Sequence, residues 1–144
     1  MAGFYKSVKF SALGPIDGRP VMLDDTCYFV ACVSAQQEAF LVALLEEPLC
    51  KKFIATVAFA DAKRPVTKKL LQRIDLLALV RHSDLDRVFE KANAALKIFS
   101  PSSNELVDRS LAERFVENEM TIGAGVARET LVNVDDASYQ LVLF

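Results

Sequence analysis

The residues from 61 to 73, DAKRPVTKKLLQR, carry five positive charges and a single acid, Asp61. The cations of this stretch, together with two lysines that precede it, are Lys63, Arg64, Lys68, Lys69, Arg73, Lys51 and Lys52. Lysine and arginine side chains neutralise phosphates and release counterions, which gives affinity for nucleic acid of any sequence. These seven residues are therefore the candidate DNA-binding residues. The alternative is a solvated helix face followed by a loop.

The charge distribution along the chain is uneven, although the 144 residues have a net charge of only −2. Residues 1–82 contain eleven Lys/Arg and eight Asp/Glu, a net of +3, whereas residues 83–144 contain six and eleven, a net of −5. Such asymmetry is typical of a basic working surface on an acidic remainder, and also of ordinary surface variation. A protein that binds polyanions over its whole surface is excluded.

Catalytic patterns are missing from the sequence, and we predict no catalytic, cofactor or metal residue. It contains no GxxxxGK[ST], GxSxG or HExxH segment. Asp24 and Asp25 form the most suggestive acidic pair, but neighbours on a strand point to opposite faces, which favours a turn or a structural role. His82 is the only histidine and fits a loop or a cap. The three cysteines, Cys27, Cys32 and Cys50, are expected to be buried thiols.

The first part of the chain predicts a small antiparallel sheet. Residues 3–10 are typical of a strand, Gly14-Pro15 and Asp17-Gly18 of a turn, and residues 21–23 and 26–32 of further strand pieces. A reducing cytoplasm is expected from the odd cysteine count, and no apolar run is long enough to span a membrane.

The middle of the chain predicts helices. Ser34 and Gln37 form a capping-box pattern before an apolar stripe. Further helices are expected at about 48–59, after Thr67, at about 84–98 with Ser83 as its cap, and at about 104–118. Their inward residues are predicted to include Leu49, Phe53, Ile54, Val57, Leu106, Val107, Leu111 and Phe115. The segment 74–80, IDLLALV, fits either a strand or a helix end.

The end of the chain contains two further β-rich pieces, TLVNV and SYQLVLF, which could pair as a C-terminal hairpin. The fold class expected is therefore α+β, with a small N-terminal antiparallel sheet, a helical middle and this candidate hairpin. We expect two parts, a DNA-recognition-like domain at 1–99 and an appended helix plus hairpin at 100–144.

Residues 3–79 resemble the C-terminal target-recognition region of bacterial adenine-specific DNA methyltransferases from restriction-modification systems. The resemblance rests on the order and spacing of short pieces: GFYK at 3–6, the turn from Gly14-Pro15 to Gly18, DDT at 24–26, and DAKRP at 61–65 followed by Thr67. It implies contact with double-stranded DNA. The family's glycine-rich cofactor motif and its Asn-Pro-Pro-aromatic catalytic motif do not occur here, so S-adenosylmethionine would bind a catalytic domain that this sequence lacks.

The resemblance leaves several origins open: a separate specificity subunit completed by a methyltransferase catalytic subunit, a truncated gene product, or a degenerate remnant. In each case the basic segment is expected to hold phosphates, with bases read elsewhere, such as by the Gly14–Arg19 loop. The competing hypotheses are a protein-interaction or structural domain with no nucleic-acid role, and a small enzyme that uses Asp24 or Asp25 with a metal.

Overall fold

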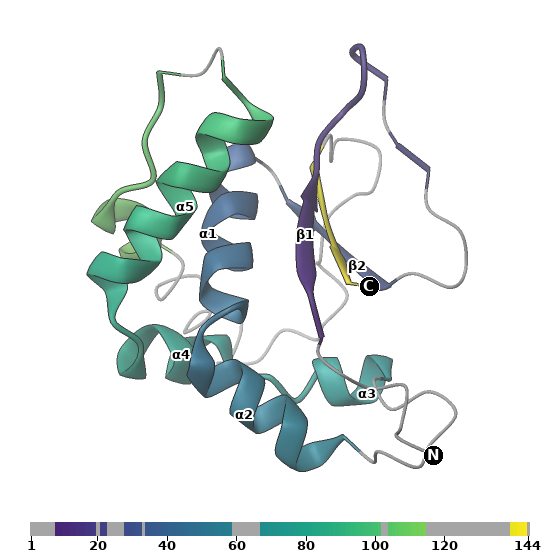
Figure 1. Cartoon of the computed structure of the whole chain (residues 1–144), viewed down its shortest axis with the longest axis vertical. Coiled ribbons are helices and arrows are strands. Elements are labelled where there is room, and N and C mark those ends of the chain that lie inside the picture. Colours follow the sequence, from purple (N-terminus) through teal and green to yellow (C-terminus); the bar gives the residue numbers. More distant parts are fainter. Residues whose placement is uncertain are drawn as a thin grey trace.

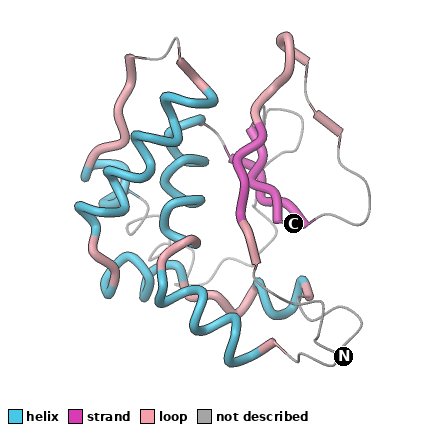
Figure 2. The backbone as a smooth tube through the Cα atoms, in the orientation of Figure 1, coloured by secondary structure: helices cyan, strands magenta, loops and turns pink. Residues whose placement is uncertain are grey.

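Helix α1 (Ala35–Leu45) lies between a sheet of three described strands and helix α5 (Leu85–Phe99), so that the fold has a helix–helix–sheet arrangement (Figure 1). The computed structural model describes residues 8–19, 21–22, 28–32, 34–58, 67–101, 104–114 and 139–143. The elements are β1 (Phe10–Leu13), β2 (Tyr28–Cys32), α1 (Ala35–Leu45), α2 (Pro48–Val57), α3 (Lys68–Leu71), α4 (Leu76–His82), α5 (Leu85–Phe99) and β3 (Tyr139–Leu143). Helices α1 and α5 lie on one side of the strands (Figure 2), and the combination of helices with an antiparallel sheet confirms the α+β class.

The last strand is the central strand of the sheet. The strand order is β1-β3-β2, and β3 is antiparallel to both neighbours. Leu141 faces Ala12 on one side and Val30 on the other. Strand β3 pairs on both edges with N-terminal strands. These are not the partners that the expected terminal hairpin would give it. The other expected arm, residues 130–134, lies outside the described residues.

The two parts of the chain therefore share one sheet and one core. Val107 and Ala112 belong to the same buried cluster as the residues of α1 and α5. The division into a recognition domain and an appended segment remains a prediction about roles.

Helix α1 is buried around its whole circumference because α5 covers one side and the sheet covers the other. Ser34 has extended backbone angles, and its Oγ accepts a hydrogen bond from Gln37 N at 3.1 Å, so the predicted cap is confirmed. Phe40 is fully buried and stacks on Phe89 of α5, with ring centroids 5.8 Å apart. This contact joins the two helices at the centre of the core.

Helices α2, α4 and α5 each begin at a residue whose side chain favours the start of a helix. Pro48 is the first residue of α2, where its missing N–H is harmless. Asp75 caps α4 through Ala78 N at 2.9 Å, so the ambiguous segment 74–80 is mostly helical. Asp84 caps α5 through Arg87 N at 3.3 Å. The predicted cap at Ser83 was wrong by one residue, because Ser83 instead ends α4 by donating its N–H to Leu79 O.

The turn between β1 and the following segment confirms the sequence signal. Ile16 and Arg19 exchange two backbone hydrogen bonds, at 3.0 and 2.9 Å. Asp17 and Gly18 both have positive φ, 51° and 72°, as a type I′ turn requires. The strand itself is later than expected: β1 starts at Phe10, whereas residues 3–7 lie outside the described residues. Of the pieces expected at 21–23 and 26–32, Val21 and Met22 are not in a strand, and the described strand is β2.

Two predictions about inward-facing residues were wrong. Leu49 is 43% exposed because α2 turns Cys50 and Ile54 toward the core, with Phe53 and Val57 only half-buried. Leu106 is 66% exposed because residues 104–108 are not helical, and the helix in this region begins at residue 109. Of residues 104–108, only Val107 is buried, so this segment turns one side chain toward the core and leaves Leu106 in solvent.

Candidate nucleic-acid interface

The described candidate cations lie on two short helices and the turn that follows one of them. Lys51 and Lys52 are exposed on α2, Lys69 is exposed on α3, and Arg73 is exposed in the turn after α3. Lys63 and Arg64 lie outside the described residues. Lys68 is the first residue of α3, and its side chain is likewise outside the description. The structure therefore places four of the seven predicted side chains.

Helix α3 is anchored on its apolar side, and Lys69 is in solvent. Leu70 is buried, and Leu71 packs against the core cluster. Thr67 caps the helix as predicted, because its Oγ1 accepts from Leu70 N at 3.3 Å. Arg73 N donates to Leu70 O at 3.0 Å, which closes the turn. Residues 67–74, TKKLLQRI, contain three cations and no acid.

Helix α2 has the same two-sided character. Cys50 and Ile54 are buried one turn apart, and Lys51, Lys52, Ala55 and Thr56 are exposed. Residues 48–58, PLCKKFIATVA, contain two cations and no acid. Neither segment contains an acid of its own, although Glu46 and Glu47 directly precede the first and Asp75 directly follows the second.

Helices α2 and α3 lie at one end of the molecule's longest axis, and the Ile16–Arg19 turn lies at the other end (Figure 1). Phosphate contacts at α2 and α3 would be separated from base contacts at this turn by the length of the molecule. A duplex would have to run along that axis to touch both ends. The expected division of labour between the basic segment and the Gly14–Arg19 loop therefore requires an extended footprint.

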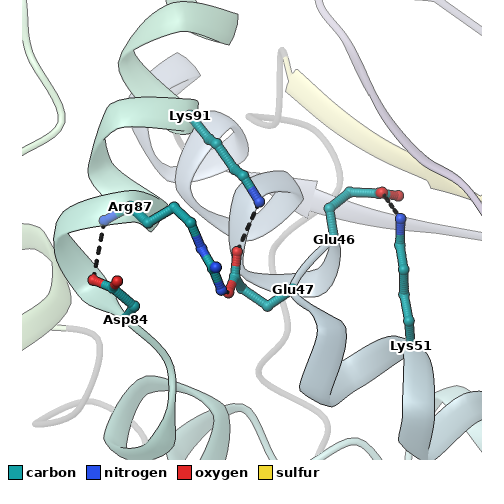
Figure 3. Close-up of polar contacts among 6 residues, drawn as sticks. All are labelled: Glu46, Glu47, Lys51, Asp84, Arg87 and Lys91. Carbon is teal, nitrogen blue, oxygen red and sulfur yellow. Dashed lines mark hydrogen bonds and ion pairs between the residues drawn. The ribbon is translucent and has the colours of Figure 1, made fainter.

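One of the four placed cations is paired with an acid. Lys51 Nζ forms an ion pair with Glu46 Oε2 at the junction of α1 and α2 (Figure 3). Within the part of the chain that the structure describes, Lys52, Lys69 and Arg73 have no ion-pair partner. These three side chains are available to an external anion.

Three cations of the acidic second half, Arg87, Lys91 and Arg109, are paired with acids. Arg87 and Lys91 of α5 both bind the carboxylate of Glu47, with Lys91 Nζ 2.9 Å from Oε1 (Figure 3). Burial alone would raise the pKa of Glu47, but the hydrogen bonds and charges of Arg87 and Lys91 outweigh it, and the pKa is lowered. Arg109 pairs with Asp86. In the described residues, no acid of the second half pairs with a candidate DNA-binding cation.

Two glutamates do work that the sequence reasoning missed. Glu38 Oε1 accepts from Leu13 N at 2.6 Å, and Glu46 Oε1 accepts from Phe10 N at 3.0 Å. Both carboxylates thereby satisfy N–H groups of β1, the strand at one edge of the sheet. Glu38 is fully buried in α1, although Gln36 and Gln37 directly precede it. The sequence signal that could have found it is its position next to the apolar residues 39–45, because a buried carboxylate requires hydrogen-bond donors.

The remaining sequence candidates give no catalytic arrangement among the placed residues. Asp24 and Asp25 lie outside the description, as does Cys27. Cys32 and Cys50 are buried free thiols, as predicted, and burial raises the pKa of Cys50 to about 11. His82 is exposed in the last turn of α4. The described residues contain no group of three or more His, Cys, Asp or Glu that could hold a metal ion.

Comparison with known proteins gives one informative similarity. The chain is 33% identical over 81 residues to the Type II methyltransferase M.NspV of Nostoc sp.. The matched region is 56% of this chain and 17% of the relative, so the chain spans less than a fifth of the relative's length. No family model and no solved structure matches the chain.

The chain therefore contains a methyltransferase-related region. This finding supports the coarser part of the resemblance found in the sequence. Among the described helices, none has the length and apolar character needed to cross a membrane.

Proposed function

We propose that this protein is a DNA-binding target-recognition module related to adenine-specific DNA methyltransferases, and that it holds duplex DNA without transferring methyl groups by itself. The similarity to a Type II methyltransferase over 81 residues carries the proposal. The short match to the relative, and the lack of both methyltransferase motifs in the sequence, favour a non-catalytic part. S-adenosylmethionine and the catalytic groups would belong to a methyltransferase subunit acting with it.

The proposed contact surface is the exposed side of α2 and α3. Lys52, Lys69 and Arg73 are exposed and have no ion-pair partner among the described residues. Lys63, Arg64 and Lys68 lie between or next to these residues in the chain and are proposed to extend the same surface. Cations of this kind contact phosphates and set the position of a protein on the duplex.

Two properties separate this proposal from the alternative of a protein-interaction domain. The first is the salt dependence of binding, because each neutralised phosphate contributes about −0.9 to the slope of log K against log salt. Four contacts give a slope of about −3.6. The second is sequence preference, which a target-recognition module has and a solvated basic surface does not.

The test is a fluorescence-anisotropy titration of the full chain with a labelled 30-base-pair duplex at several salt concentrations, followed by selection from a pool of random duplexes. The proposal predicts a steep negative slope and an enriched sequence that contains adenine. Binding without enrichment would leave only a phosphate-binding surface. Loss of all binding at about 50 mM salt, with a methyltransferase subunit also present, would contradict the proposal and favour the interaction domain.

A further inference from the structure

The ion pair at the α1–α2 junction divides the two neighbouring lysines of α2 into different roles. Lys51 and Lys52 are adjacent and both exposed. The sequence alone therefore gives no reason to assign them different roles. Lys51 is paired with Glu46, whereas Lys52 has no ion-pair partner among the described residues. We infer that Glu46 prevents Lys51 from adding a phosphate contact, so that the phosphate-binding surface includes Lys52 but ends before Lys51. This inference rests on the proposed function.

Glu46 is fixed in place by contacts other than its pair with Lys51. It caps the end of α1, with its N–H donating to Val42 O at 3.0 Å. Its Oε1 accepts from Phe10 N at 3.0 Å, while its Oε2 faces Lys51. The hydrogen bond from Phe10 N does not involve Lys51, so Glu46 can keep it when Lys51 leaves the ion pair. The carboxylate is therefore a permanent feature of this junction.

A fixed carboxylate opposes a phosphate at Lys51. An ion pair that is largely exposed is weak, and Lys51 could leave it at little cost, since 44% of its side chain is accessible. A phosphate that binds the ammonium group in its observed position would however lie close to Glu46, and the two negative charges repel each other at such a short separation. The gain from the new contact is offset by that repulsion. Lys51 consequently adds no net phosphate contact.

The variant Glu46→Gln tests this inference without removing the acceptor for the N–H of Phe10 in β1. Glu46→Gln keeps an oxygen that can accept from Phe10 N and removes the negative charge beside Lys51. Glu90→Gln is the matched control, because Glu90 is an exposed acid of α5 with no ion pair among the described residues, and the change in net charge is the same. Thermal unfolding of each variant checks that the fold is retained.

The measurement is the slope of log K against log salt for the 30-base-pair duplex. The inference predicts a slope about 0.9 steeper for Glu46→Gln, no change for Glu90→Gln, and no change for Lys51→Gln in the native background. The double variant Glu46→Gln/Lys51→Gln should return to the native slope.

Two results would overturn the inference alone, given that the native chain binds with a negative slope. One is a native slope in Glu46→Gln, and the other is a slope about 0.9 shallower in Lys51→Gln. If the native chain itself does not bind the duplex, the proposed function fails and the inference fails with it.

Discussion

Asn93 of α5 holds both backbone polar groups of Val107. Its Oδ1 accepts from Val107 N at 2.8 Å, and its Nδ2 donates to Val107 O at 3.0 Å. The same amide nitrogen also reaches Phe89 O at 2.9 Å. One side chain thereby supplies to the segment after α5 the donor and the acceptor that a neighbouring strand would supply. Val107, only 3% exposed, is fixed against the core without belonging to a helix or strand.

Replacement of Asn93 should therefore destabilise the fold. Asn93→Ala leaves the N–H and C=O of Val107 without these partners in a buried setting, and we expect a loss of about 2–4 kcal/mol in the free energy of unfolding. Urea unfolding followed by circular dichroism measures it. Asn104→Ala, at an exposed position, is the control and should change stability by less than about 0.5 kcal/mol. Equal effects of the two variants would show that the Asn93 contacts do not hold the segment.

The Glu47 cluster predicts an acid-dependent loss of stability. The folded-state pKa of Glu47 is lowered, so its contribution is complete above the unfolded-state value of about 4.3 and is lost as pH falls through the lower folded value. Glu47→Gln should reduce the free energy of unfolding by about 1–2 kcal/mol at pH 7, discounted because both cations are half-exposed.

Urea unfolding of the native chain and Glu47→Gln between pH 7 and pH 3 checks this expectation. The difference between the two proteins should shrink on acidification, because protonated Glu47 resembles glutamine. Glu90→Gln serves again as the exposed control. A difference that stays constant across this range would argue against a lowered pKa in the folded state.

The buried thiols should be unreactive in the native protein. Burial raises the pKa of Cys50 to about 11, so the thiol is protonated at pH 8, and the reactive thiolate is almost absent. Cys32 is also fully buried. In a Cys27→Ser background, we expect no labelling by iodoacetamide at pH 8 in buffer and labelling of both cysteines in 8 M urea. Rapid labelling of Cys50 in buffer, seen by peptide mass spectrometry, would contradict its burial.

The central position of β3 makes the end of the chain essential to the sheet. Leu141 is paired with Ala12 and with Val30, so a proline there removes an N–H from a strand with neighbours on both sides. We expect Leu141→Pro to cost about 1–3 kcal/mol in stability, because the partner of the lost N–H is left without its hydrogen bond. Thermal unfolding measures the effect, with Leu141→Val as the control that keeps the N–H. A native melting temperature for the proline variant would show that β3 is dispensable.

The local elements of this fold could be predicted well from the sequence because their signals are short-range. Ser34 and Thr67 cap the helices that follow them, and Asp17-Gly18 forms the turn that its residue types require. The errors about inward-facing residues came from packing between distant segments. Asn93 binds the backbone of Val107, fourteen residues later in the sequence, and Val107 is buried. Its neighbour Leu106 is exposed as a result.

The candidate interface could be predicted only in part for the same reason. The sequence shows where cations concentrate, and the structure adds that Lys52, Lys69 and Arg73 are exposed. The sequence does not show which cations have partners. Glu46 reaches Lys51 from the end of the preceding helix while it also binds Phe10, a residue thirty-six positions away. No periodicity or composition reports such a contact.

The central claim is that the DNA-binding surface contains Lys52, Lys69 and Arg73, which are exposed and have no ion-pair partner among the described residues. The most direct test compares Lys52→Gln/Lys69→Gln with Lys97→Gln/Arg114→Gln, which removes the same charge from exposed positions outside α2 and α3. The account predicts a slope of log K against log salt about 1.8 shallower for the first double variant and a native slope for the second. Equal slopes for the two double variants would contradict it.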